Sequence, residues 1–188
     1  HRDIHFAFSD PVIFSKTSLF YLKDKIGKLQ FEKHADLKTY KFGGVLGYFY
    51  EEPFEKAGLH VQYVATDEQN LKLLIINRVD IVPMSDFAGW YLIQKEYPEF
   101  SDKIDYVDYD PPGNTNINSY AVRIAVNKNA PEADVLLQTY RSGLKKILLN
   151  GDYQRLLSKY GVDQRQSEKY IEDIQKTLSQ STHQRPND

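Results

Sequence analysis

Hydrophobic and polar residues alternate along the middle of the chain in units of strand, turn and helix. Residues 40–46 form an apolar run typical of a buried strand. The stretch "EEPFEKAG" behind them has acidic residues in its first turn and ends at Gly58, which predicts a short helix. Residues 59–65 alternate as a second strand. Thr66 and Gln69 then form a capping-box pattern that predicts the start of another helix.

The same alternation continues through a third unit. "VDIVPM" predicts a strand, and residues 87–95 predict a helix that closes before Pro98. Residues 105–118 are polar and rich in turn formers, so we expect a loop or a boundary between units there. The repeated strand and helix signals over residues 38–108 predict an α/β unit. Its sheet should hold at least four strands, be parallel or mostly parallel, and carry helices on both faces.

Both ends of the chain show further amphipathic patterns. Residues 4–8 alternate as a strand that begins almost at the first residue, and residues 120–126 alternate as another. A long helix is predicted over residues 132–149, with an apolar face made of Leu136, Tyr140, Leu144 and Leu148. Two shorter helices are predicted at about 152–160 and 166–179.

Composition and charge narrow the class of protein. The 188 residues are 41% hydrophobic and 13% aromatic, which is enough to bury a core. Lys and Arg number 24 against 26 Asp and Glu, so there is no basic field for a nucleic acid or an anionic membrane surface. No apolar run approaches the roughly 20 residues that span a bilayer. The sequence therefore predicts a globular domain with no nucleic-acid partner and no membrane insertion.

Catalytic and metal-binding patterns are weak. The chain has no cysteine, which excludes disulfides, zinc-thiolate sites and thiol nucleophiles. Its five histidines show no metal-ligand spacing, and no serine lies in a nucleophile-elbow pattern. We therefore predict neither an enzyme nor a cofactor.

Several motifs in a fixed order carry a family resemblance. They are "R-x5-FSDP", "ADLKTYKFGGVLG", "NRVDIVPMSD", "YAVRIAVNKNAPEAD" and "NGDYQRLLSKYG", and they extend over residues 2–161. In order and spacing the chain resembles the solute-binding proteins of polar amino-acid transporters, periplasmic binding protein family 3. No one motif is decisive; the order carries the resemblance.

The resemblance implies a clamshell fold, in which two α/β lobes joined by two crossing strands close around a small ligand. Lobe two would comprise residues 26–117, and lobe one residues 1–25 and 118–188. In the family, further strands and helices precede the matching arginine, so we expect lobe one to be incomplete in this chain. The apolar faces of 4–8, 120–126 and 132–149 should then be bare or covered by another chain.

The resemblance also implies a ligand site. Arg2 falls on the arginine that clamps a ligand carboxylate, and a guanidinium suits that task; the alternative is a frayed surface arginine. Backbone N–H groups at the helix start after Gly47 would bind the same carboxylate. Where the family has small hydroxyl residues this chain has three aromatic ones. Tyr48 and Tyr50 are expected to line the cleft. Phe49 either packs in the core beneath the helix or completes, with the two tyrosines, a flat apolar wall of the ligand site.

A second stretch of the site is expected at "DIVPMSDF". The acidic residue that holds the ligand ammonium in the family falls on Ser85 here, with Asp86 one residue later. Either a local bulge brings Asp86 into the cleft, or Asp86 is the N-cap of the next helix while Ser85 lines the cleft; we favour the cap. Arg2 and the aromatic residues together favour a carboxylate solute with an apolar or ring portion.

Three functions fit the resemblance. The first is a periplasmic binding protein that delivers a small polar, carboxylate-bearing solute to the membrane permease of an ABC transporter. The second is an extracytoplasmic ligand-sensing domain of a signalling receptor. The third is a cyclic-acid dehydratase, because a fold alone does not determine function. We favour the first.

Overall fold

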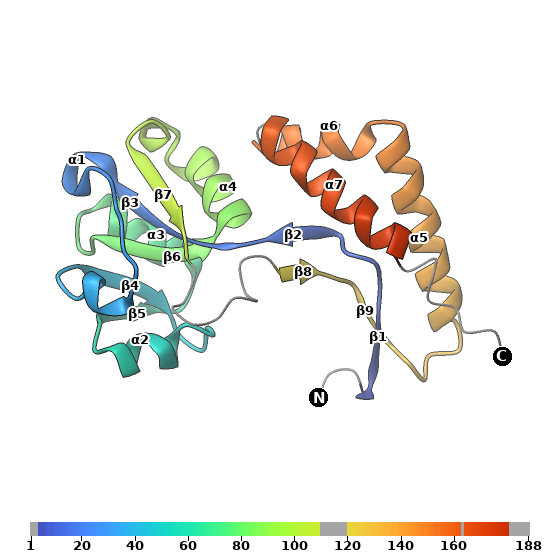
Figure 1. The fold of residues 1–188 in the computed structure, drawn as a ribbon, viewed down its shortest axis with the longest axis horizontal. Coiled ribbons are helices and arrows are strands. Elements are labelled where there is room, and N and C mark those ends of the chain that lie inside the picture. Colours follow the sequence, from blue (N-terminus) through green and yellow to red (C-terminus); the bar gives the residue numbers. More distant parts are fainter. Residues whose placement is uncertain (1–3, 110–119, 163, 181–188) are drawn as a thin grey trace. The chain divides into compact units, whose positions relative to one another are not determined.

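The chain divides into two compact units in the computed structural model, which describes residues 4–109, 120–162 and 164–180 (Figure 1). Unit 1 comprises His1–Ser15 and Tyr120–Asp188, and unit 2 comprises Lys16–Ser119. The first division thus falls after Ser15, whereas the resemblance implied residue 25. The reason is that β3 (Thr17–Leu22) is an interior strand of the sheet of unit 2.

Unit 2 is built on a five-stranded mixed sheet. Its strand order is β5 (His60–Val64), β4 (Lys41–Val45), β6 (Ile81–Ser85), β3 and β7 (Ile104–Asp108). β4 runs parallel to both β5 and β6, whereas β3 is antiparallel to β6 and β7. The predicted sheet of at least four strands is confirmed, with β3 as an antiparallel addition from the N-terminal part of the chain.

Helices cover both faces of this sheet, as predicted. One core contains Leu19 and Tyr21 of β3 and packs against α2 (Glu51–Ala57) and the 3-10 helix η2 (His34–Leu37). The other contains Phe20 and Leu22 and packs against α3 (Asp67–Ile75) and α4 (Asp86–Glu96). Successive residues of β3 serve opposite faces because side chains alternate along a strand. The short α1 (Lys23–Ile26) and η3 (Pro98–Phe100) complete the unit.

The predicted loop at residues 105–118 is wrong at its start, because residues 104–108 form β7. This strand lies at one edge of the sheet and pairs only with β3 among the described strands. An edge position tolerates acidic residues: Asp108 is exposed and forms an ion pair with Lys16 at 2.6 Å. Tyr106 and Val107 pack against opposite cores, so the strand pattern was present but was hidden by the charges around them.

In unit 1, short strands near the N-terminus pair antiparallel with strands from residues 120–127. β1 (Phe6–Phe8) pairs with β9 (Ala125–Asn127), and β2 (Ile13–Ser15) pairs with β8 (Tyr120–Val122). The single strand predicted over 120–126 is therefore two strands. The break coincides with side-chain contacts, because Arg123 donates to the Ser9 carbonyl at 2.7 Å and the Ile124 N–H donates to Ser9 Oγ at 3.0 Å.

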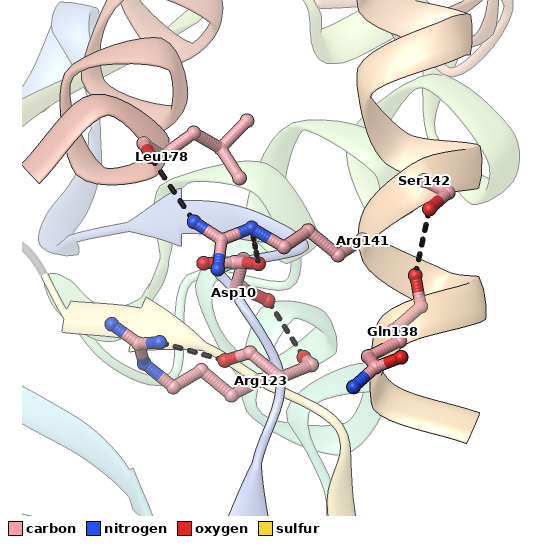
Figure 2. A network of polar contacts seen from close by, with 7 residues as sticks. Asp10, Arg123, Gln138, Arg141, Ser142 and Leu178 are labelled. Atoms are coloured by element: carbon pink, nitrogen blue, oxygen red, sulfur yellow. Dashed lines mark hydrogen bonds and ion pairs between the residues drawn. The ribbon is translucent and has the colours of Figure 1, made fainter. Parts of the chain in front are cut away.

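Three helices complete unit 1: α5 (Ala133–Leu149), α6 (Asp152–Lys159) and α7 (Gln164–Gln180). All three were predicted from their periodicity. Figure 2 shows Arg141 of α5 reaching Asp10, at 3.4 Å, and the Leu178 carbonyl of α7, at 3.1 Å. The Tyr153 hydroxyl of α6 donates to the Val12 carbonyl at 2.7 Å. The corner between β1 and β2 is thereby tied directly to α5 and α6, and Arg141 links α5 to α7.

Unit 1 leaves many large apolar side chains in solvent. Leu144 of α5 is buried, but Leu136 on the same predicted face is 52% exposed. The expectation of bare apolar faces is confirmed only in part. The exposed apolar residues of these elements are Ile4, Phe6, Tyr120, Val122, Ile124 and Leu136, together with Val135 and Leu149, which lie outside the predicted face of α5. In the described part of the chain, no helix combines the length and the hydropathy needed to cross a membrane.

Candidate functional site

Three segments of unit 2 gather where the carboxyl ends of its parallel strands lie, which we call the carboxyl edge. They are residues 46–50 after β4, residues 65–67 between β5 and the start of α3, and residues 85–86, where β6 ends and α4 begins. These three strands are neighbours and run parallel, so their carboxyl ends meet at the same edge. In open α/β sheets, ligands bind outside the carboxyl ends of the strands. The carboxyl edge is therefore the candidate functional site of this unit.

The first segment is a turn at Gly47, which has a left-handed backbone (φ 78°) that favours glycine. Its neighbour Leu46 donates its N–H to the Val64 carbonyl at 3.0 Å, which ties the turn to β5. The Gly47 N–H donates to Glu51 Oε2 at 2.6 Å. The Gly47 N–H is thus already bound by a carboxylate of the chain itself.

The aromatic residues after Gly47 lie differently from the sequence expectation. Tyr48 is 41% exposed and Phe49 is 50% exposed, whereas Tyr50 is 1% exposed. Of the two places expected for Phe49, the core is excluded, because its ring is half exposed. Tyr50, expected in the cleft, packs on Phe54 with ring centroids 5.2 Å apart. Tyr50 turns inward because its hydroxyl accepts the Val45 N–H at 2.9 Å, a donor at the end of β4. Burial raises the pKa of the Tyr50 phenol, so it stays neutral.

Replacing Tyr50 by phenylalanine is expected to destabilise unit 2 by about 1–3 kcal/mol, because it leaves the buried Val45 N–H without an acceptor. Replacing Tyr48 by phenylalanine is the matched control. Its hydroxyl lies at the exposed surface, so the expected cost is below about 1 kcal/mol. Urea unfolding of both variants measures the difference. Equal losses would show that the Tyr50 hydroxyl does not hold the turn.

A tyrosine and a carboxylate meet at this edge, a pair that no sequence pattern indicated. The Tyr48 hydroxyl donates to Asp67 Oδ2 at 3.1 Å. Asp67 Oδ1 is buried and has no hydrogen-bond partner among the described residues. Burial raises the pKa of Asp67, and the nearby Glu68 raises it further, while the Tyr48 hydrogen bond lowers it. The pair was hidden in the sequence because an aspartate in the first turn of a helix is an ordinary helix feature.

At the third segment, the prediction that Asp86 is the N-cap of the next helix is wrong. The N-cap of α4 is Ser85, whose Oγ accepts the Ala88 N–H at 3.5 Å. Asp86 is the first residue of the helix and is 2% exposed. Its Oδ1 accepts the Lys16 N–H at 3.1 Å and the Phe87 N–H at 2.8 Å. Asp86 therefore fastens the start of β3 to α4, while Ser85 is half-buried at the edge.

Arg2, the remaining predicted site residue, lies outside the described residues. Within the described residues, Gly47, Tyr48, Phe49, Ser85 and Asp86 all belong to the segments of the carboxyl edge, and Tyr50 supports one of them from below. The side chains of Glu51, Asp67 and Asp86 give this edge three carboxylates. Among the described residues, no group of three or more His, Cys, Asp or Glu side chains is arranged to hold a metal ion.

Comparison with known proteins gives a match at the level of structure only. No family model matches the chain, and no curated protein matches it. An ancestral cationic amino-acid solute-binding protein superposes with a TM-score of 0.65 at 20% identity, over 85% of this chain and 63% of that one. The L-cystine solute receptor of Neisseria gonorrhoeae gives a TM-score of 0.60 at 20% identity, over 84% of this chain and 60% of that one.

A third solved structure, the substrate-binding protein of an amino-acid ABC transporter, gives a TM-score of 0.59 at 20% identity, over 86% of this chain and 66% of that one. This chain therefore spans less than two thirds of the length of these three proteins. At identities near 20%, these superpositions establish the fold alone. The chain accordingly has the α/β fold of the amino-acid solute-binding proteins, as the order of its sequence motifs implied.

Proposed function

We propose that this chain binds a small amino-acid-like solute at the carboxyl edge of unit 2 and serves as a periplasmic binding component of an ABC transporter. The observation that carries the proposal is the meeting of three segments at the ends of three neighbouring parallel strands, with exposed rings beside carboxylates. The fold shared with amino-acid solute-binding proteins supports it. Binding and delivery, not turnover, is the proposed activity, and the proposed partner is a membrane permease.

The chemistry of the edge favours an ammonium group of the solute. The Tyr48 hydroxyl and the Asp67 carboxylate form a polar pair at 3.1 Å, and the exposed rings of Tyr48 and Phe49 lie in the neighbouring loop. Carboxylates attract an ammonium group directly, and aromatic faces attract it through their quadrupoles. A solute carboxylate is disfavoured at the Gly47 turn, since Glu51 already occupies its N–H.

Two sequence-based assignments remain part of the proposal. Arg2 is proposed as a partner of a solute carboxylate on the family resemblance alone, since a guanidinium binds carboxylates with two parallel hydrogen bonds. Ser85 is proposed to contact the solute, because it is half-buried at the end of β6. An α-amino acid carries both groups, an ammonium group for Asp67 and a carboxylate for Arg2.

The Asp67→Asn substitution is expected to weaken binding of an ammonium-bearing solute about tenfold or more, because it removes one charge-assisted hydrogen bond. The amide oxygen still accepts from Tyr48, so the turn is preserved. The same substitution is expected to stabilise the chain at neutral pH. The pKa of Asp67 is raised above its ordinary value of 3.8 by burial, so its charged form opposes folding.

The pH dependence has a defined sign. The folded chain holds the Asp67 proton more tightly than the unfolded chain, so stability falls as pH rises from about 3.8 through the raised folded pKa. The Asp67→Asn variant should not show this loss of stability with rising pH. Glu99→Gln is the matched control, because it removes the same charge from an exposed residue outside the carboxyl edge. Calorimetric titration measures the affinity for the solute, and thermal unfolding at a series of pH values measures the stability. An unchanged affinity in the Asp67→Asn variant would show that Asp67 does not contact the solute.

A calorimetric titration tests the proposed function. The chain is titrated with arginine, glutamine, glutamate and phenylalanine, and with the deaminated acid that corresponds to the best binder. We expect saturable heat with at least one amino acid, a large loss of affinity with its deaminated analogue, and recovery of the amino acid unchanged. No heat with any amino acid, or equal affinity for the deaminated acid, would contradict the proposal.

A further inference from the structure

A depression of about 440 Å³ lies at the opposite edge of the unit 2 sheet, where β4 and β5 begin. We call it the basic depression. The side chains of Lys41, His60, Gln62 and Arg78 line it together with Phe42 and Val79. Phe42 and Val79 are buried in the two cores of the unit, whereas the three basic residues are exposed. No acidic residue contributes to the lining.

The backbone holds the three basic residues in one place. Lys41 and His60 are paired Cα partners in the parallel register of β4 and β5, so their side chains project from the same face of the sheet. Arg78 follows α3, after a left-handed turn at Asn77 (φ 59°). The N–H of the nearby Asp80 donates to the Lys41 carbonyl at 2.7 Å, which fixes the segment after Arg78 against β4.

These three basic side chains lack an anionic partner. None of them forms an ion pair or a side-chain hydrogen bond within the part of the chain that the structure describes. The Asp80 carboxylate is engaged elsewhere, because it accepts the backbone N–H of Lys41 at 2.8 Å and faces Lys25 at 3.4 Å. Unit 2 as a whole has more Asp and Glu than Lys and Arg. Lys41 and Arg78 therefore bring two cations to a depression with no acidic lining, on a unit that is acidic as a whole.

Stabilisation of the end of α3 does not explain the group. Basic residues often lie near the carboxyl end of a helix, where they complement its dipole and bind its last carbonyls. Here backbone donors already serve those carbonyls: the Asn77 N–H donates to the Leu74 carbonyl at 3.0 Å, and the Arg78 N–H donates to the Leu73 carbonyl at 2.9 Å. The side chains of Lys41, His60 and Arg78 are therefore available to bind an external group.

The charge pattern selects the kind of external group. A nucleic acid or an anionic bilayer presents an extended array of negative charge, which the acidic remainder of unit 2 would repel. A small-molecule site encloses most of its ligand, whereas the basic residues here are exposed. A short acidic segment of a protein meets the cations Lys41 and Arg78, with His60 beside them in the lining, without either difficulty.

We propose that the basic depression is a docking surface for a protein partner that presents a short acidic segment. The inference does not rest on the proposed solute binding. The depression and the carboxyl edge lie at opposite ends of β4 and β5, which are five residues long, or about 16 Å. A partner on the depression therefore leaves the carboxyl edge uncovered.

Fluorescence anisotropy with a labelled synthetic peptide tests the proposal. The peptide is rich in Asp and Glu, and its control carries Asn and Gln at the acidic positions. The test variant combines Lys41→Glu with Arg78→Glu. The matched control combines Lys28→Glu with Lys72→Glu, two exposed lysines of the same unit that lie outside the depression, so the net charge of the two variants is equal. A neutral pair, Lys41→Gln with Arg78→Gln, covers the case in which charge reversal disturbs folding.

We expect the acidic peptide to bind the wild type and the matched control equally, and the test variant about tenfold or more weakly. Binding should also weaken between about 50 and 500 mM salt, because exposed charges are screened. Equal binding by test and control variants would overturn the proposal, and so would binding of inorganic phosphate at the depression without binding of the peptide. Amino-acid titration of the test variant should be unchanged, which separates a failure here from a failure of the proposed function.

Discussion

Replacing Phe20 by alanine is expected to lower the free energy of unfolding of unit 2 by about 3–5 kcal/mol. Phe20 is fully buried in the interior strand β3. Its ring stacks on Tyr106 at 5.6 Å between centroids and meets the edge of Trp90 at 5.9 Å. Removing the ring leaves a cavity between β3, β7 and α4 that this closely packed core cannot fill by relaxation. Urea unfolding followed by the fluorescence of Trp90, the only tryptophan, reports on this core directly.

Phe49→Ala is the matched control. It removes the same side chain from a position that is half exposed at the carboxyl edge, so the expected loss is below about 1 kcal/mol. A similar loss for the two variants would show that the core of unit 2 is not organised around β3.

The second large effect is expected at Gly89 of α4. A Cβ at this position would overlap the outer atoms of the Phe20 ring, and the ring has no free direction because Tyr106 and Trp90 flank it. Alanine favours a helix over glycine by about 1 kcal/mol, yet the clash outweighs this gain. Gly89→Ala is therefore expected to destabilise the chain by about 1–3 kcal/mol.

Replacing a second helical glycine by alanine is expected to have the opposite effect on stability. At Gly143 of α5, the described residues place no atom within 4 Å of the position that a Cβ would take, so Gly143→Ala should only gain helix propensity. We expect it to stabilise its unit by about 0.5–1 kcal/mol. Thermal unfolding followed by circular dichroism compares the two variants, and a stabilising Gly89→Ala would contradict the packing of α4 on β3.

The sequence predicted the elements whose apolar pattern agrees with their surroundings. β4, β5 and β6 alternate or run apolar, and each is followed by a helix with a clear start. β7 was missed because Asp105 and Asp108 interrupt its pattern, and only its position beside β3 explains why those charges are tolerated. The place of β3 within unit 2 also depends on pairing between residues far apart in sequence, which no local pattern encodes.

The sequence predicted which segments hold the candidate residues, but not the contacts that these residues make. The order of motifs placed Gly47, Tyr48 and Ser85 in segments that the structure brings to one edge. The inward turn of Tyr50 follows from a hydrogen bond to the Val45 N–H, and periodicity does not register such a bond. The contact between Tyr48 and Asp67 joins residues 19 positions apart in different segments, so it emerges only when β4 and β5 are paired.

Binding of a small amino-acid-like solute at the carboxyl edge of unit 2 can be located residue by residue. The experiment is a series of amide NMR spectra of the whole chain, recorded while the best-binding amino acid is added to saturation. We expect the largest shifts in residues 46–48, 66–67 and 85–86, and no change at Lys41, His60 and Arg78 on the opposite edge. Saturable shifts confined to any other part of the chain, or no shifts with any amino acid, would contradict binding at this edge.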